Sequence, residues 1–197
     1  MPNTRSFPAV SAYALRLAES LQTFDWSIVE TLAGKVLDLW SRGSTLWICG
    51  NGGSAANAVH WANDFLYPVA KRASRGARIQ ALTENPAVVT CLGNDIGYEK
   101  IFSYQLRTFA APGDLLIALS GSGNSPNILE ALKAGRELGV ETCAILGFDG
   151  GAALSITDLP VHFAVDDMQV AEDAQMVVCH ALVQALVDHP SRPVHAS

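Results

Sequence analysis

The sequence predicts an α/β fold with a doubly wound parallel sheet and a helical extension at the N-terminus. Apolar, strand-like runs alternate with helical segments along most of the chain, which is typical of a parallel sheet covered on both faces. Two of these runs end in loops rich in glycine and serine that lead directly into helices. The 197 residues, 49% of them hydrophobic, are enough for a sizeable core.

The composition limits the classes of protein to which the chain can belong. Only 16% of the residues are charged, which is low for a monomer and favours a large subunit interface. The net charge of −6 argues against direct nucleic-acid binding. No apolar run reaches the roughly 18 residues of a membrane span, and no signal-peptide pattern is present, so we expect a cytoplasmic protein without a membrane partner. Every cysteine lies in an apolar segment, so we expect reduced core thiols at Cys49, Cys91, Cys143 and Cys179.

Two helices are expected before the first strand. The first covers about residues 9–21, and the second opens with Ser27-Ile28-Val29-Glu30, which fits a capping box, and ends near Gly43. Their apolar faces have no strand of their own to cover, so we expect a helical layer shared between subunits. The chain then reads as a single domain over 1–197, with N-terminal helices at 9–42 and an α/β core at 43–188.

The core contains the strands and the helices that connect them. We expect a turn-rich loop at Leu92–Tyr98 and a helical stretch through Tyr104, Gln105 and Leu106. Later helices are expected from about Asn127 to Leu138 and from about Val170 to Val187. The expected strands lie near 46–49, 78–82, 115–119, 142–146 and 161–164.

The first glycine-rich loop, at 50–54, follows the first strand and leads into a helix. Its glycines allow backbone N–H groups to turn inward, and Ser54 is expected to cap the helix while offering its hydroxyl. Together with the positive end of the helix dipole, this loop predicts an anion site. His60 and Asp64 are four residues apart, so both should project from one face of this helix as a proton-transfer pair.

The second such loop, at 120–125, contains three serines and precedes a helix with Ser125 as N-cap and Pro126 at its first position. In a doubly wound sheet the two loops should face one crevice, where they could bind a phosphate. A Walker A loop is excluded because neither loop contains a lysine. The permissive dinucleotide pattern Gly50-x-Gly52-x-x-Ala55 matches, but no acidic residue ends the second strand, so we expect no nucleotide cofactor.

Four loops carry a family resemblance: Cys49-Gly-Asn-Gly-Gly-Ser54, Gly93-Asn-Asp95, Ser120-Gly-Ser-Gly-Asn-Ser125 and Gly147-x-Asp-Gly-Gly151. In this order they resemble the sugar isomerase (SIS) phosphosugar-binding domain, and within it the sedoheptulose-7-phosphate isomerase (phosphoheptose isomerase) family. The resemblance implies a flavodoxin-like, five-stranded parallel sheet and a homotetramer. It also implies a ketose–aldose isomerase that converts sedoheptulose 7-phosphate to glycero-manno-heptose 7-phosphate through an enediol.

The resemblance also assigns residues to the substrate. In the family, Asn94 and Asp95 match residues that contact the sugar, and Glu172 lies at a further substrate position. The sugar phosphate is held by the two glycine- and serine-rich loops, here Asn51, Gly52, Gly53, Ser54, Ser120, Gly121, Ser122 and Ser125.

The proton-transfer positions match less well. The family has His and, four residues on, Glu, where this chain has His60 and Asp64; it has Gln and, eight residues on, His, where this chain has Glu172 and His180. The resemblance implies that these four positions can bind zinc, and that Asp64 and His180 move protons. Asp64 is one methylene shorter than Glu, and misplacement on that scale can lower the rate by about 100-fold. Glu172 should strengthen a divalent-metal site.

A non-enzymatic alternative stays open. The DnaA-binding replication-initiation factors of the same family share the run Ser54-Ala-Ala-Asn57 seen here. That branch lacks the acid and the final histidine, whereas this chain has Asp64 and His180. The resemblance therefore favours an enzyme over an adaptor that binds a sugar phosphate without turnover.

Overall fold

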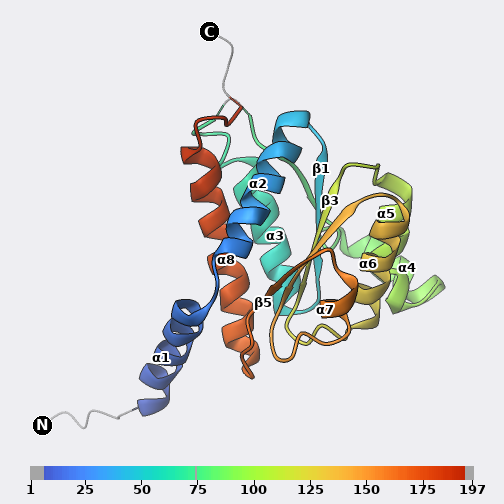
Figure 1. The fold of residues 1–197 in the computed structure, drawn as a ribbon. Coiled ribbons are helices and arrows are strands. Elements are labelled where there is room, and N and C mark those ends of the chain that lie inside the picture. Colours follow the sequence, from blue (N-terminus) through green and yellow to red (C-terminus); the bar gives the residue numbers. More distant parts are fainter. Residues whose placement is uncertain (1–6, 74, 194–197) are drawn as a thin grey trace, which may run out of the picture.

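The computed structural model describes residues 7–73 and 75–193, and its centre is a five-stranded parallel sheet (Figure 1). The strand order is β2-β1-β3-β4-β5, and every neighbouring pair is parallel. This order confirms the predicted flavodoxin-like sheet. The strands are β1 (Thr45–Gly50), β2 (Arg78–Ala81), β3 (Leu115–Ser120), β4 (Glu141–Leu146) and β5 (Leu159–His162).

Helices cover both faces of the sheet. Helices α2, α3 and α8 lie on one face, and α4, α5, α6 and α7 lie on the other (Figure 1). The helices are α1 (Pro8–Thr23), α2 (Ser27–Arg42), α3 (Gly53–Leu66), α4 (Pro86–Asp95), α5 (Ser103–Phe109), α6 (Pro126–Glu137), α7 (Ala153–Ile156) and α8 (Met168–Asp188), with a short 3₁₀ helix at Tyr98–Lys100.

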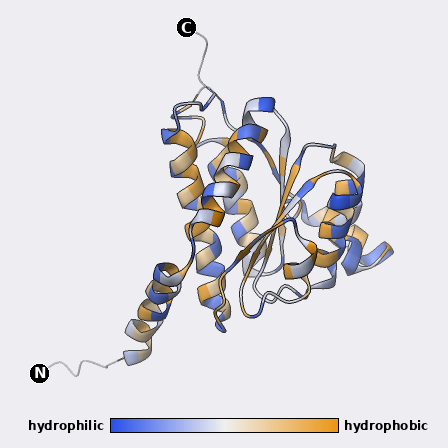
Figure 2. Cartoon of the chain, viewed as in Figure 1, coloured by the Kyte–Doolittle hydropathy of each residue, from blue (hydrophilic) through white to orange (hydrophobic). Residues whose placement is uncertain are grey.

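The strands are rich in hydrophobic residues, as the hydropathy colouring shows (Figure 2). They are apolar on both faces because each face of the sheet packs against helices. Successive residues alternate between two cores. Leu46 and Ile48 pack with α2, α3 and α8, whereas Trp47 and Cys49 pack toward α5 and α6. This alternation explains why the strands appear in the sequence as continuous apolar runs.

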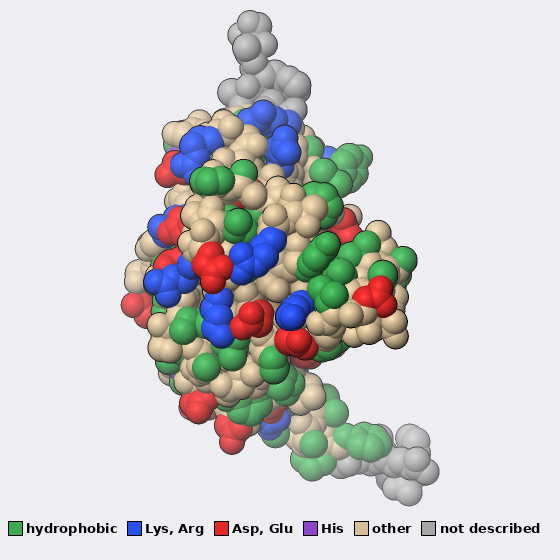
Figure 3. Space-filling model, turned by 90° about the vertical axis from the view of Figure 1, so that its right-hand side faces the viewer, with side chains coloured by type: hydrophobic (Ala, Val, Ile, Leu, Met, Phe, Trp, Pro, Cys, Tyr) green, Lys and Arg blue, Asp and Glu red, His purple; other side chains and the backbone are tan. Residues whose placement is uncertain are grey.

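The outer surface of the α4–α7 layer carries acidic, basic and hydrophobic side chains in close mixture (Figure 3). Ion pairs join Arg107 to Glu137 and Lys133 to Glu130, all of them exposed. Such exposed pairs contribute little to stability, about 0–1 kcal/mol each.

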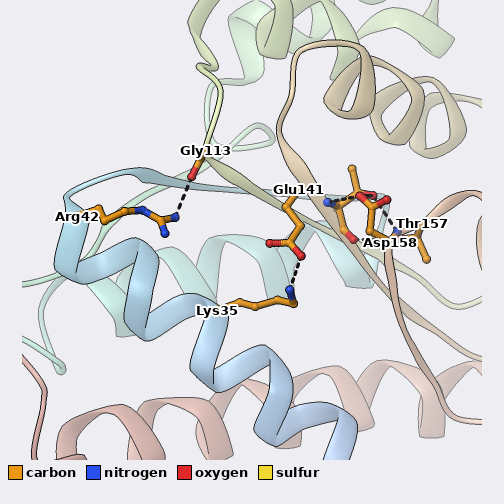
Figure 4. A network of polar contacts seen from close by, with 7 residues as sticks. Lys35, Arg42, Gly113, Glu141, Thr157 and Asp158 are labelled. Atoms are coloured by element: carbon orange, nitrogen blue, oxygen red, sulfur yellow. Dashed lines mark hydrogen bonds and ion pairs between the residues drawn. The ribbon is translucent and has the colours of Figure 1, made fainter.

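A second set of polar contacts lies at the amino ends of the strands, where two of them join α2 to the sheet and one joins β4 to the residue before β5 (Figure 4). Lys35 pairs with Glu141 at the start of β4, and Arg42 donates to the Gly113 carbonyl at 3.3 Å. Thr142 donates through its hydroxyl to Asp158 Oδ2 at 2.7 Å. These contacts lie at the end of the sheet opposite the glycine- and serine-rich loops, so we assign them to the scaffold.

Helix α1 lies apart from the body of the molecule, beside the start of α8 (Figure 1). None of its 16 residues is buried. The apolar residues Val10 and Leu15 are each 70% exposed. It is held to α8 by an ion pair from Arg16 to Asp167 at 2.9 Å and by a hydrogen bond from Tyr13 to Asp173. A helix with this apolar exposure lacks a covering surface within its own chain.

The expected loop at Leu92–Tyr98 is wrong, because its first four residues complete helix α4. The helix begins at Pro86 after Asn85, whose side chain accepts hydrogen bonds from the backbone N–H groups of Ala87 and Val88 at 3.1 and 3.2 Å. No residue of α4 is buried, so its apolar periodicity is weak. The signal that could have found it is the pair Asn85-Pro86, a cap followed by proline at the first position.

The capping box expected at Ser27 is also wrong. The residue before the helix is Trp26, and the Ser27 backbone N–H is bound instead by Asp25 Oδ1 at 3.1 Å. The hydrogen bonds from Ser27 lower the pKa of the Asp25 carboxyl. The carboxylate two residues upstream therefore takes the capping role that the sequence pattern assigns to serine.

The cysteines divide into two groups. Cys49, Cys143 and Cys179 are buried, and burial raises the pKa of each thiol, with Asp64 adding to the effect at Cys179. The prediction of core thiols is confirmed for these three. It is wrong for Cys91, which is exposed on α4 and has its pKa raised by a hydrogen bond to Asp95.

Helix α8 is long and apolar enough, by length and composition alone, to cross a membrane. Half of its most apolar window is buried, and the helix packs against α1, α2 and α3. A core helix of a globular domain passes the same test. Its composition is therefore weak evidence for a membrane span.

Candidate active site

The two glycine- and serine-rich loops lie side by side at the carboxyl ends of β1 and β3. These strands are neighbours, with Gly50 opposite Leu119, and the chain runs outward from them in opposite directions. This is the switch point at which doubly wound sheets bind ligands. A cavity of about 240 Å³ opens there, lined by Asn51, Gly52, Gly53, Ser54, Leu119, Ser120, Gly121, Ser122, Ser125, Met168 and Glu172. We name this cavity the cradle.

The serine loop presents hydroxyl groups to the cradle. Ser120 Oγ accepts from the Gly123 N–H at 3.1 Å, and Ser122 Oγ accepts from the Asn124 N–H at 3.3 Å. Each hydroxyl thus has its hydrogen free to donate to a ligand. Ser125 is the residue before α6, as expected, and it makes no side-chain capping bond, so its hydroxyl is also available.

The loop at 147–151 supports the serine loop from behind. Gly123 has φ +64°, and a Cβ there would lie 2.0 Å from the Gly150 carbonyl oxygen, so only glycine allows this approach. Asn124 Oδ1 accepts from the Ala152 N–H at 2.9 Å. The fourth motif of the sequence therefore stiffens the third, which is the serine loop.

The first loop turns sharply at Gly52, whose φ is +56°, and α3 begins at Gly53. Ser54 is therefore inside the first turn, and its predicted role as N-cap is wrong. Its side chain is buried and its Oγ accepts from Gln175 Nε2 of α8 at 3.1 Å. Gln175 also accepts from Asn57 Nδ2 at 2.9 Å, so a buried amide that the sequence analysis missed connects the cradle to α8.

A pair of amides joins the two loops directly. Asn51 Nδ2 donates to Asn127 Oδ1, and Asn127 Nδ2 donates to Asn51 Oδ1, both at 2.8 Å. The Tyr98 hydroxyl donates to the same oxygen of Asn51 at 3.1 Å. The Asn51 amide is therefore occupied by protein partners, and it positions the loop rather than reaching freely into the cradle. Asn127 and Tyr98 were not assigned to the site from the sequence.

A second cluster lies further along α3 and α8. His60 Nε2 is 3.3 Å from Asp64 Oδ2, His180 Nε2 is 3.5 Å from the same oxygen, and the two Nε2 atoms are 3.3 Å apart. The expected pairing of His60 and Asp64 on one face is confirmed. The carboxylate is the least exposed member, with 16% of its side chain accessible against 47% for His60 and 53% for His180.

The cluster suits a divalent cation of the zinc type. One ligand atom from each of His60, Asp64 and His180 lies within 4.8 Å of the others. Two imidazoles and a carboxylate with an open position form the donor set of catalytic zinc sites. Glu172 is absent from this group of described residues, so the structure does not support the expected fourth ligand.

The direction of the Glu172 side chain explains why it does not join His60, Asp64 and His180. Side chains on a helix tilt toward its N-terminus, and Glu172 precedes His180 by about two turns, or about 12 Å. Its carboxylate accordingly points away from the histidines and lies against Gly53, in the cradle.

The cradle and the cluster are joined by parallel stretches of α3 and α8. Three successive contacts show that the two helices run alongside each other in the same direction. They are Gly53 with Glu172, Asn57 with Gln175, and His60 with His180. Seven residues of α3 separate Gly53 from His60, which corresponds to about 10 Å along the helix. The cradle and the cluster of His60, Asp64 and His180 are thus about 10 Å apart along α3.

Comparisons with known proteins agree with this geometry. The SIS domain family matches residues 11–147. The phosphoheptose isomerase of Trichlorobacter lovleyi is 38% identical over 155 residues, covering 78% of both chains. That of Chlorobaculum parvum is 35% identical, covering 87% of this chain and 83% of the other. The chain belongs to the phosphoheptose isomerase family.

A solved structure supports the same assignment. The phosphoheptose isomerase of Neisseria gonorrhoeae superposes with a TM-score of 0.84 at 28% identity, covering 92% of this chain and 96% of that one. The family resemblance and the five-stranded SIS fold predicted from the sequence are confirmed.

Two positions expected to contact the sugar in this phosphoheptose isomerase family member lie outside the cradle. Asn94 and Asp95 are the last residues of α4, both exposed, and Asn94 Nδ2 donates to Asp95 Oδ1 at 2.7 Å. In the single chain they are not among the residues that line the cradle. Tyr98, three residues on, is the part of this segment that reaches the site, through Asn51.

Proposed function

We propose that this chain is an isomerase that converts sedoheptulose 7-phosphate to glycero-manno-heptose 7-phosphate through an enediol. One observation carries the proposal: the cluster of His60, Asp64 and His180 lies about 10 Å along α3 from a cradle built for an anion. Membership of the phosphoheptose isomerase family supports the same reaction.

The spacing fits a seven-carbon substrate. An extended chain from phosphorus to the carbonyl carbon of a 7-phospho-2-ketose has seven single bonds, which span about 9 Å. A phosphate in the cradle would place the carbonyl end beside His180. A five-carbon ketose phosphate has two bonds fewer between phosphorus and the carbonyl carbon and would match the spacing less well.

We assign proton transfer to His180 and Asp64. Isomerisation requires a base that removes the proton beside the carbonyl, and an acid that returns it to the neighbouring carbon. The His180 imidazole is exposed, so a substrate can reach it, and its Nε2 lies 3.5 Å from the Asp64 carboxylate, which orients the ring. Asp64 also accepts from Asn63 Nδ2 at 2.9 Å, which fixes its orientation.

A zinc ion would be held by His60, Asp64 and His180, whose donor atoms are already close together, and the Asp64 oxygen that does not ligate the ion would remain to accept a proton. When bound, the ion would polarise the substrate carbonyl and favour loss of the neighbouring proton. No nucleotide cofactor is part of the proposal, because neither loop contains the lysine of a Walker A motif and no acidic residue ends the second strand.

We further propose a homotetramer in which the N-terminal helices pack between subunits. The exposed apolar residues of α1 support this, because a second chain would cover them. A monodisperse monomer in light scattering at micromolar concentration would contradict it. The four free thiols suit a reducing compartment, and we place the protein in the cytoplasm, with no direct nucleic-acid or membrane partner.

The deciding experiment incubates the protein with a panel of ketose phosphates, with and without added zinc, and measures the aldose phosphate formed. We expect sedoheptulose 7-phosphate to be converted fastest. His180→Asn should lower the rate by about 10²–10⁴-fold while sugar-phosphate binding survives. If the wild type converts none of the panel under either condition, the enzyme assignment fails and an adaptor of the DnaA-binding type is favoured.

A further inference from the structure

The Glu172 carboxylate lies inside the cradle, against the first residue of α3. A Cβ built on Gly53 would be 2.3 and 2.4 Å from the two carboxylate oxygens. Both oxygens therefore pack against the Cα of Gly53, and a larger residue at position 53 would displace them. Of the residues that line the cradle in the described part of the chain, Glu172 is the only charged one.

The cradle attracts a negative charge for physical reasons. The first N–H groups of α3 have no carbonyl partner within the helix, and the helix dipole adds partial positive charge at this end. The serine hydroxyls can donate to the same space. A carboxylate from α8 and the phosphate of a ligand are both suited to this environment, and they cannot occupy the same volume.

We propose that Glu172 is a built-in competitor for the anion site: its carboxylate fills part of the cradle in the free protein, and a bound phosphate must displace it. Glu172 thereby sets the affinity of the site for sugar phosphates. The inference rests on the proposed phosphate site and deepens it.

The structure allows the displacement without movement of the backbone. The Glu172 carbonyl accepts from Asn57 Nδ2 at 3.0 Å, so the main chain is held to α3. The side chain is only half-buried and has three rotatable bonds, so it can turn toward solvent. Substrate would thus exchange one anion for another at a rigid site.

The test compares Glu172→Gln with the wild type in calorimetric titrations with inorganic phosphate and with sedoheptulose 7-phosphate, in the presence of a chelator. In the wild type the phosphate must first displace a carboxylate that the cradle itself attracts, whereas the neutral amide of the variant is held less strongly, so the variant should bind about fivefold more tightly or better, which corresponds to about 1 kcal/mol. The gain should shrink as salt is added, because screening weakens the attraction of the cradle for the carboxylate. Asp188→Asn, which removes the same charge from the exposed far end of α8, is the matched control and should leave both affinities unchanged.

Each outcome decides the proposal. Equal affinities of Glu172→Gln and wild type overturn it, and weaker binding by the variant shows that Glu172 assists the ligand instead. Glu172→Asp withdraws the carboxylate by one methylene, so its affinity for phosphate should lie between those of the wild type and Glu172→Gln. This variant tests the proposal if the glutamine variant does not fold.

A separate variant distinguishes this inference from the proposed function. If Ser122→Ala with Ser125→Ala abolishes phosphate binding but Glu172→Gln gains nothing, only the competitor role is lost. If the serine variant binds phosphate as the wild type does, or no protein of the series binds it, the cradle assignment fails as well.

Discussion

Removal of the Asn127 side chain should uncouple the two loops of the cradle. Asn127→Ala deletes two hydrogen bonds of 2.8 Å to Asn51, and Asn127 is 1% exposed, so water cannot easily replace them. Each bond contributes about 1 kcal/mol, and a polar group left buried without a partner costs about 1–3 kcal/mol. We expect the free energy of unfolding to fall by about 3–5 kcal/mol in urea titrations. We also expect KM for sedoheptulose 7-phosphate to rise about tenfold, because the loops lose their fixed spacing.

Two controls isolate the amide pair. Tyr98→Phe removes only the 3.1 Å bond to the same Asn51 oxygen, from a ring that is 57% exposed, and should cost under about 1 kcal/mol. In a double-mutant cycle, Asn51→Ala and Asn127→Ala together should cost less than their sum, with a coupling of about 1–3 kcal/mol. An Asn127→Ala protein with unchanged KM and stability, or additive losses in the cycle, would refute the reasoning.

Three further predictions follow from other parts of the site and scaffold. Ser122→Ala with Ser125→Ala removes two donors worth about 1.5–3 kcal/mol each to an anion, so calorimetry should show sugar-phosphate affinity at least about tenfold lower; unchanged affinity would contradict the cradle. Asp64→Asn should lower the isomerisation rate by about 10²–10⁴-fold. Asp64→Glu restores the family's longer acid and should raise the rate. Equal rates for the wild type and both variants would exclude Asp64 from proton transfer. Partial burial and the carboxylate of Asp173 on α8 raise the pKa of Tyr13 from 10.0 to about 12. The contribution of this contact to stability is therefore complete below pH 10 and lost as the pH rises toward 12; Tyr13→Phe should remove that loss, and an identical alkaline profile for the two proteins would contradict the contact.

The arrangement of the sheet could be predicted because buried parallel strands have a simple sequence pattern. Residues 115–119 are apolar on both faces, and they became the central strand β3 with every residue buried. The glycine and serine clusters then marked where the neighbouring strands end. The prediction of a loop at Leu92–Tyr98 was wrong for a local reason. Helix α4 has no buried residue, so nothing in its periodicity distinguished it from a loop.

The loops of the site could be predicted, whereas the contacts between them could not. Asn127 and Gln175 are buried amides whose partners, Asn51 and Ser54, lie 76 and 121 residues away. Such pairings depend on how α6 and α8 pack, and no local spacing encodes them. The same reason explains Glu172, which family spacing places with His180 but whose side-chain direction places it in the cradle.

Within residues 7–73 and 75–193, the residues that line the cradle carry no positive charge, which explains why these unpredicted contacts matter. A site that binds phosphate with lysine or arginine tolerates some looseness, because the attraction between charges changes slowly with distance. Hydroxyl and N–H donors act only within hydrogen-bonding distance and at good angles. The chain carries a net charge of −6 and places a carboxylate in the cradle itself, so electrostatic attraction cannot compensate for misplaced donors. Affinity therefore depends on rigid loops, which Asn127 and the loop at 147–151 provide.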